Sequence, residues 1–153
     1  MTNTDIMINT GLERFILLDS ITEVSATDIV GVRSFDGSPV YLGMEALAQL
    51  GAFHIRHLTG FDRHIFLLKV AACRLSSGKS LTGRLVLSGQ LVSQSDAAFT
   101  CRLKAERESE EKPLIEGEFL FASVRYDHNF ISGTLHNHYE KVFTCLLNDI
   151  KPD

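Results

Sequence analysis

The sequence has no long hydrophobic segment, no excess of positive charge and no secretory signal. No apolar run reaches the roughly 18–20 residues that a membrane-spanning helix needs. The N-terminal residues lack the basic start and apolar centre of a signal peptide, so we expect a cytoplasmic protein. The formal net charge is −4 at pH 7, which disfavours nucleic acid and anionic membranes as partners.

The cysteines are few and lie far apart. Cys73, Cys101 and Cys145 include no CxxC pair, so we expect free, buried thiols in a reducing compartment. The GKS sequence at residues 78–80 lacks the first glycine of a phosphate-binding GxxxxGK loop. We therefore predict neither a bound metal nor a cofactor.

The most informative stretch that is present is a single apolar helix pattern. Residues 44–53 read MEALAQLGAF, in which Met, Glu, Ala, Leu and Gln all favour helix. From Ala46 to Phe53 the pattern is apolar nearly all round, with Gln49 as the strongly polar interruption. A helix of this kind is buried rather than lying on a surface. We predict that it begins near residue 43 or 44 and ends near Gly60.

Alternating apolar residues predict several strands around this helix. Leu85, Leu87 and Leu91 share one face of a strand, and Arg84 lies on the other. The predicted strands cover residues 15–24, 26–33, 65–75, 81–93, 97–106 and 114–126, with turns at 36–39 and 76–80 and a charged hairpin tip at 106–112. Strands joined by short turns form an antiparallel sheet. A long antiparallel sheet wrapped around one central α-helix is the α+β hotdog fold.

The length of 153 residues suits one domain with a hydrophobic core. We place the hotdog domain at residues 1–126, with its core from about residue 11. Residues 127–153 form a C-terminal extension. Within it, Val142, Phe143 and their apolar neighbours predict a short amphipathic helix over roughly residues 135–150.

The segment that leads into the central helix resembles the hotdog-fold 3-hydroxyacyl-[acyl carrier protein] dehydratases. That family carries H-F-P-G-x-P-V-M-P-G followed by a helix with E-A-x-A-Q. This chain reads S-F-D-G-S-P-V-Y-L-G at 34–43 and E-A-L-A-Q at 45–49. The positions that match are Phe35, Gly37, Pro39, Val40, Gly43, Glu45, Ala46, Ala48 and Gln49. Residues 14–21 and 74–81 look like shortened forms of two further family segments.

Two departures separate this chain from the standard enzymes of fatty acid biosynthesis. The catalytic histidine of the family falls on Ser34, and the spacing from Gly43 to Glu45 is three residues shorter. The shorter form P-x-x-x-G-x-E-x-x-A-Q resembles the divergent dehydratase-like subfamily of aryl polyene gene clusters.

The resemblance implies that a 3-hydroxyacyl thioester loses water, for which a base takes a proton from C2 and an acid protonates the departing hydroxyl. A carboxyl group in an apolar pocket holds its proton near neutrality, so Glu45 is the predicted acid. Asp36 is the nearest ionisable substitute for the missing histidine. Backbone N–H groups of Gly43 and Met44 are predicted to stabilise the thioester oxygen, and Gln49 to orient Glu45 or a water. The other predicted substrate-binding residues are Ser34, Gly37 and Pro39.

Several alternatives stay open at this point. Glu45 can be a charge that stabilises a helix N-terminus, and Asp36 a turn residue. A thioesterase could use Glu45 alone to activate water, and a silent acyl-binding or partner subunit would need no histidine at position 34. An unrelated α+β domain with a chance motif is the last alternative. The expected partners are an acyl carrier protein or coenzyme A thioester and a second copy of the chain, whose residues 34–43 would lie near Glu45.

Overall fold

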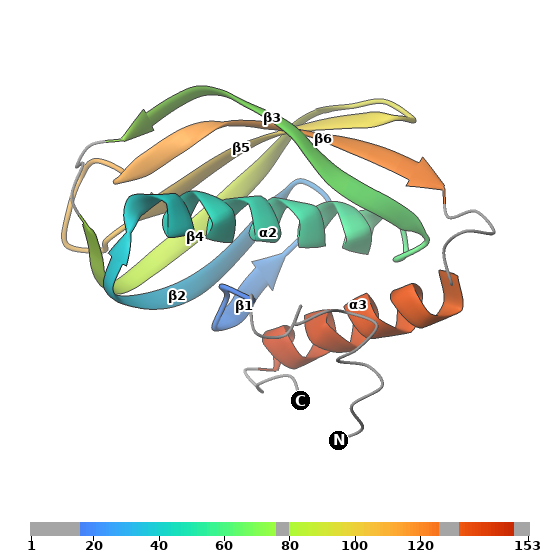
Figure 1. Cartoon of the computed structure of the whole chain (residues 1–153), viewed down its shortest axis with the longest axis horizontal. Helices are drawn as coiled ribbons and strands as arrows, with labels where there is room; N and C mark the ends of the chain where they lie inside the picture. The colour runs from blue at the N-terminus through green and yellow to red at the C-terminus, as the bar shows by residue number, and fades with distance from the viewer. Residues whose placement is uncertain (1–15, 76–79, 126–131, 149–153) are drawn as a thin grey trace.

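A computed structural model describes residues 16–75, 80–125 and 132–148 of the chain. In these residues, six antiparallel strands form one sheet in the order β1-β2-β4-β5-β6-β3 (Figure 1). The elements are β1 (Ser20–Val24), β2 (Asp28–Pro39), α2 (Val40–Leu58), β3 (Arg63–Leu75), β4 (Ser80–Gln94), β5 (Ala98–Glu106), β6 (Ile115–Arg125) and α3 (Ser132–Leu147). Neither of the described helices is long and apolar enough to cross a membrane.

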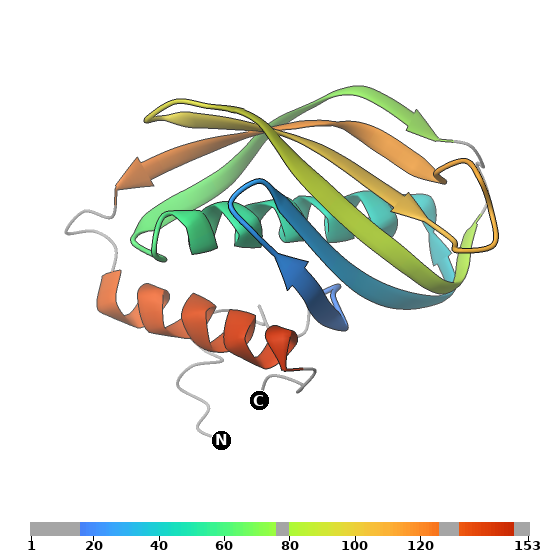
Figure 2. The same cartoon turned by 180° about the vertical axis from the view of Figure 1, so that it is seen from behind.

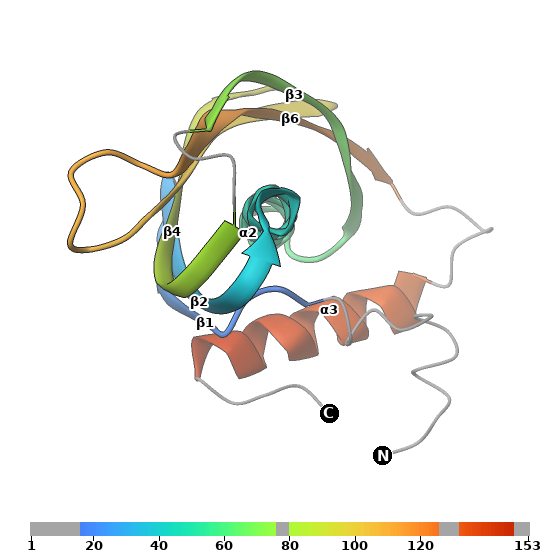
Figure 3. The same cartoon turned by 60° about the vertical axis from the view of Figure 1, so that its left-hand side comes forward.

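The sheet curves around α2, which lies along its concave side (Figure 3). Ala46, Leu47, Leu50 and Ile55 of α2 are fully buried. The buried strand residues on the facing side include Leu85, Leu87, Leu103, Phe119 and Phe121. Seen from behind, β2 and β4 cross α2 on the side away from β3 (Figure 2). The predicted hotdog fold is therefore confirmed.

Two glycines let α2 approach the sheet closely. A Cβ atom at Gly51 would lie 2.9 Å from Cζ of Phe121, and one at Gly43 would lie 2.5 Å from Cδ1 of Ile115. Real side chains are excluded at such distances in a close-packed interior. These two positions therefore set how deeply the helix sits in the sheet.

The segment predicted as a turn at residues 36–39 is the last part of β2. Strand pairing with β4 continues as far as Pro39, opposite Ser80, with a bulge at Gly37, whose φ is +70°. The prediction of a loop was wrong because a bulge with a glycine at positive φ accommodates turn-favouring residues inside a strand. Pro39 occupies the N-cap position of α2 without a side-chain hydrogen bond, and the helix begins at Val40, three or four residues before the predicted start.

The other predicted elements agree closely with the structure. Apolar residues at alternate positions of β4, β5 and β6 point into the core, as the alternation predicts. The helix ends at Leu58, and Gly60 follows at a φ of +69°. The first strand is the exception: β1 begins at Ser20, and residues 16–19, which were predicted as its first half, do not form a strand. Residues 76–79 of the predicted turn, and the start of the predicted first strand at residue 15, lie outside the described residues.

The C-terminal helix α3 packs on the face of α2 that the sheet leaves uncovered (Figure 3). Its residues Val142, Phe143 and Leu146 are at most 3% exposed and belong to the same buried cluster as α2. The Phe143 ring lies 6.2 Å from the Phe53 ring and stacks at 5.1 Å on the His57 ring, centre to centre. The predicted amphipathic helix is therefore present, and it covers part of α2.

Candidate functional site

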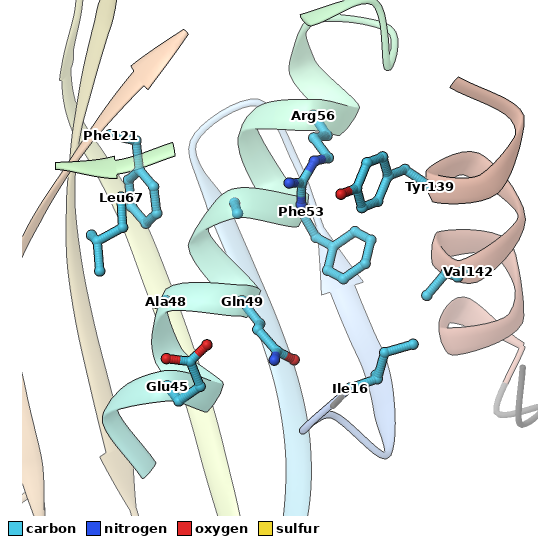
Figure 4. Close-up of a pocket in the computed structure, with 11 residues that line it drawn as sticks. Ile16, Glu45, Ala48, Gln49, Phe53, Arg56, Leu67, Phe121, Tyr139 and Val142 are labelled. Carbon is cyan, nitrogen blue, oxygen red and sulfur yellow. The ribbon is translucent and has the colours of Figure 1, made fainter. Parts of the chain in front are cut away.

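A cavity of about 200 Å³ lies between α2, α3 and the β3–β6 edge of the sheet (Figure 4). Along α2 it follows a stripe of one helix face, which three- and four-residue spacings produce. The residues that line it are Ile16, Glu45, Ala48, Gln49, Ala52, Phe53, Arg56, Leu67, Phe121, Tyr139 and Val142. Most of these side chains are apolar, and the two alanines leave the space that larger side chains would fill.

Glu45 lies at one end of this cavity, near the N-terminal end of α2 (Figure 4). Sequence analysis placed it in the first turn of the helix and in a buried setting. Both details were wrong for the single chain, because the helix begins at Val40 and the Glu45 side chain is exposed. Its carboxyl group therefore stands where an apolar cavity meets solvent.

Gln49 follows Glu45 by one turn and lines the same cavity. Its Oε1 atom accepts a hydrogen bond of 2.7 Å from the backbone N–H of Leu17. This bond fixes the segment that carries Ile16 against α2. In the single chain, Gln49 therefore holds one wall of the cavity in place.

The motif residues on β2 are not part of the cavity of a single chain. Ser34 and Asp36 are exposed on β2. The backbone N–H of Ser34 donates to Oδ2 of Asp19 (2.8 Å), and that of Gly37 donates to Oγ1 of Thr82 (3.2 Å). Like these residues, Pro39 is absent from the cavity lining. One chain thus does not bring the β2 part of the motif together with Glu45.

Gly43 and Met44 lie inside α2 rather than at its free end. In a helix that begins at Val40, the N–H groups without an intrahelical partner are those of the first three residues. Gly43 is buried and faces Leu81 and Ile115. The structure therefore corrects the predicted pair of oxyanion donors: Gly43 has a packing role in the single chain.

Sequence analysis missed the polar residues at the other end of the cavity. Arg56 is only 8% exposed, and its guanidinium carbon lies 3.9 Å from the ring centre of Tyr139 and 5.5 Å from that of Phe53. Arg56 follows Glu45 by eleven residues, which places both on one helix face. The sequence therefore contains a signal that Arg56 lies on the same side of the helix as Glu45. Tyr139 carries no such signal, because it comes from α3.

Two histidines that do not line the cavity have shifted pKa values. His54 is 1% exposed, and its Nε2 lies 2.8 Å from the carbonyl oxygen of Ser25. Burial lowers the pKa of His54 from 6.5, and the bond to Ser25 opposes that shift in part. Burial and the nearby Arg56 charge also lower the pKa of His64. Within the described residues, no three His, Cys, Asp or Glu side chains cluster as metal ligands.

No protein-family model matches the sequence, and no curated protein shows significant sequence similarity to it. Solved structures do share its fold. A mutant of the thioesterase PA1618 from Pseudomonas aeruginosa aligns with a TM-score of 0.59 at 10% identity, over 69% of this chain and 81% of that chain. The thioesterase HI1161 from Haemophilus influenzae aligns with a TM-score of 0.61 at 8% identity, over 72% and 81%.

A dehydratase heterocomplex, ApeI:P from Xenorhabdus doucetiae, is also similar. It aligns with a TM-score of 0.61 at 15% identity, over 75% of this chain and 86% of that chain. At such low identity these likenesses show the fold alone, which is the hotdog fold.

Proposed function

We propose that this protein binds an acyl thioester in the cavity between α2 and α3 and that Glu45 acts on the bound group. The observation that carries the proposal is a carboxyl group at the open end of a mainly apolar cavity. An acyl chain fits the apolar lining, and its thioester would then lie at the solvent end beside Glu45. The carrier, acyl carrier protein or coenzyme A, would remain outside the cavity.

The reaction that the motif resemblance favours is a dehydration of 3-hydroxyacyl groups, in fatty acid or polyene-type biosynthesis. Dehydration needs a base as well as the acid. Asp36 and Ser34 lie outside the cavity of one chain, so the second group would come from another copy. In this arrangement Asp36 of one protomer faces Glu45 of the other, and Ser34, Gly37 and Pro39 contact the carrier or the substrate.

The edge strand β3 supports such a dimer. It pairs with β6 on one side, and its other side forms an edge of the sheet. Phe66, Leu67 and Leu68 on β3 are 43%, 43% and 59% exposed. An apolar strand edge of this kind favours pairing with another strand, and a two-fold homodimer pairs two identical edges.

A second candidate is thioester hydrolysis. Glu45 is the only carboxylate among the cavity-lining residues of the described chain. A carboxylate that activates water is sufficient for hydrolysis, whereas dehydration needs two groups. The structurally similar proteins include thioesterases, which supports this second candidate. If neither reaction occurs, the protein is a catalytically silent acyl-binding subunit.

A panel of thioesters separates these reactions. The full chain is incubated with 3-hydroxyacyl and saturated acyl groups on both carriers, and the products are followed by mass spectrometry. Loss of water indicates dehydration, and release of the carrier indicates hydrolysis. Binding without conversion identifies a silent subunit. The proposal fails if no acyl thioester is bound or converted.

A further inference from the structure

The end of the cavity opposite Glu45 is polar, and it combines the buried Arg56 with the half-buried Tyr139. The Arg56 side chain is only 8% exposed, and it lines the cavity together with Tyr139. Figure 4 shows the Arg56 side chain beside the Tyr139 ring, with the Tyr139 hydroxyl turned toward α2.

Stacking holds the Arg56 guanidinium in a defined position. It lies over the Tyr139 ring at 3.9 Å and within 5.5 Å of the Phe53 ring centre, which are favourable cation–π distances. A guanidinium offers five N–H donors and no acceptor, so it can bind a ligand group in addition to its contacts within the protein. A ligand atom that meets it must therefore be a hydrogen-bond acceptor, and the positive charge favours an anion.

The two polar ends of the cavity are a fixed distance apart. Glu45 and Arg56 are eleven residues apart on α2, which corresponds to about 16 Å along the helix axis. Between them, Ala48, Ala52 and Phe53 provide an apolar surface. The lining thus changes from polar to apolar and back to polar along one line.

We infer that Arg56 and Tyr139 bind a carboxylate at the far end of the substrate, so that the preferred acyl group is an ω-carboxyacyl chain. This inference rests on the proposed acyl-thioester site and adds its substrate class. Arg56 forms a charge-assisted hydrogen bond to the terminal carboxylate, and the Tyr139 hydroxyl donates a second. The apolar chain then spans the alanines, and its thioester reaches Glu45.

Binding of uncleavable analogues tests this inference apart from any reaction. Thioether analogues of the acyl thioester, on coenzyme A and on acyl carrier protein, are made in pairs of equal length that end in a methyl group or in a carboxylate. Their dissociation constants for the full chain are measured by calorimetry, with each bare carrier as the control. The unchanged protein should bind the carboxylate member roughly 10- to 100-fold more tightly, as a hydrogen bond to a charged group allows. The preference should be largest for a chain that spans about 16 Å.

Substitutions then test whether Arg56 and Tyr139 cause the preference for the carboxylate-ended analogue. Arg56→Met removes the charge but retains an unbranched stem, and it should abolish the preference while the methyl-ended analogue still binds. Arg56→Lys should retain part of it. Tyr139→Phe keeps the stacked ring and should lower carboxylate binding by roughly 2- to 10-fold. Because this variant leaves the packing of α3 intact, it remains informative if Arg56→Met fails to fold.

Two results would overturn the inference in distinguishable ways. If the unchanged protein binds methyl-ended chains as tightly as carboxylate-ended chains, the ω-carboxylate specificity is wrong and the proposed acyl site stands. If neither kind of analogue binds more tightly than its bare carrier, with coenzyme A and with acyl carrier protein as carriers, the proposed function fails, and this inference fails with it.

Discussion

Gly51 of α2 lies directly against Phe121 of β6, so that a Cβ atom would come within 2.9 Å of the Phe121 ring. Phe121 is 1% exposed and also lines the cavity. The contact therefore fixes both the depth of α2 in the sheet and the position of one cavity wall.

Gly51→Ala should destabilise the fold. Overpacking costs about 1–3 kcal/mol, and the better helix propensity of alanine offsets up to about 1 kcal/mol of this. We expect a net loss of about 1–2 kcal/mol in the free energy of unfolding, measured with urea. A stabilised variant would show that α2 can move away from Phe121, and that the close approach is not required.

His54 should make the fold less stable in mild acid. The unfolded chain takes up a proton near pH 6.5, whereas the folded chain does so at lower pH because burial lowers the pKa of His54. Protons therefore favour the unfolded state, and stability is lost as the pH falls below about 6.5. Urea unfolding at pH 7.5 and 5.5 measures the loss.

The matched variant is His54→Gln, whose amide can still donate to the Ser25 carbonyl oxygen but does not titrate. Its stability should fall less between the two pH values than that of the unchanged protein. The remaining decrease includes His64, whose pKa is also lowered. An equal decrease in both proteins would mean that His54 does not contribute.

The exposed edge of β3 should form the dimer interface. Leu68 is 59% exposed on this strand, and a charge there blocks pairing between apolar edges. Light scattering of the unchanged protein should give twice the chain mass of 17.0 kDa, and Leu68→Lys should shift it toward the monomer. Leu147→Lys on α3, where the leucine is 41% exposed, is the control and should remain dimeric. A monomeric parent protein would exclude the composite site.

Local patterns in the sequence were sufficient for most of the fold. The alternation of Leu85 and Leu87 predicts a strand face without knowledge of its neighbours, because the side-chain period of a strand is two residues. The buried helix followed from its apolar pattern in the same way. Residues 36–39 were wrongly predicted as a turn because their extended conformation depends on pairing with β4, which is distant in the sequence.

The site was harder to predict than the fold. Glu45 and Gln49 were found because they share one helix and a recognisable motif. Tyr139 and Leu67 reach the same cavity from α3 and β3, and only tertiary packing brings them there. The role of Gly43 was misjudged for a related reason: its contacts with Leu81 and Ile115 are not encoded by its neighbours in the sequence.

The most direct test of the account compares two rates. They are the rates at which Glu45→Gln and the unchanged protein convert the best thioester from the panel. This substitution keeps the size and hydrogen bonding of the side chain and removes its ionisable group. Turnover should fall roughly 100- to 10,000-fold, with little change in the free energy of unfolding. Glu23→Gln, the same change at an exposed position on β1, should leave turnover unaltered. An unchanged rate in Glu45→Gln would contradict both the dehydration and the hydrolysis proposals.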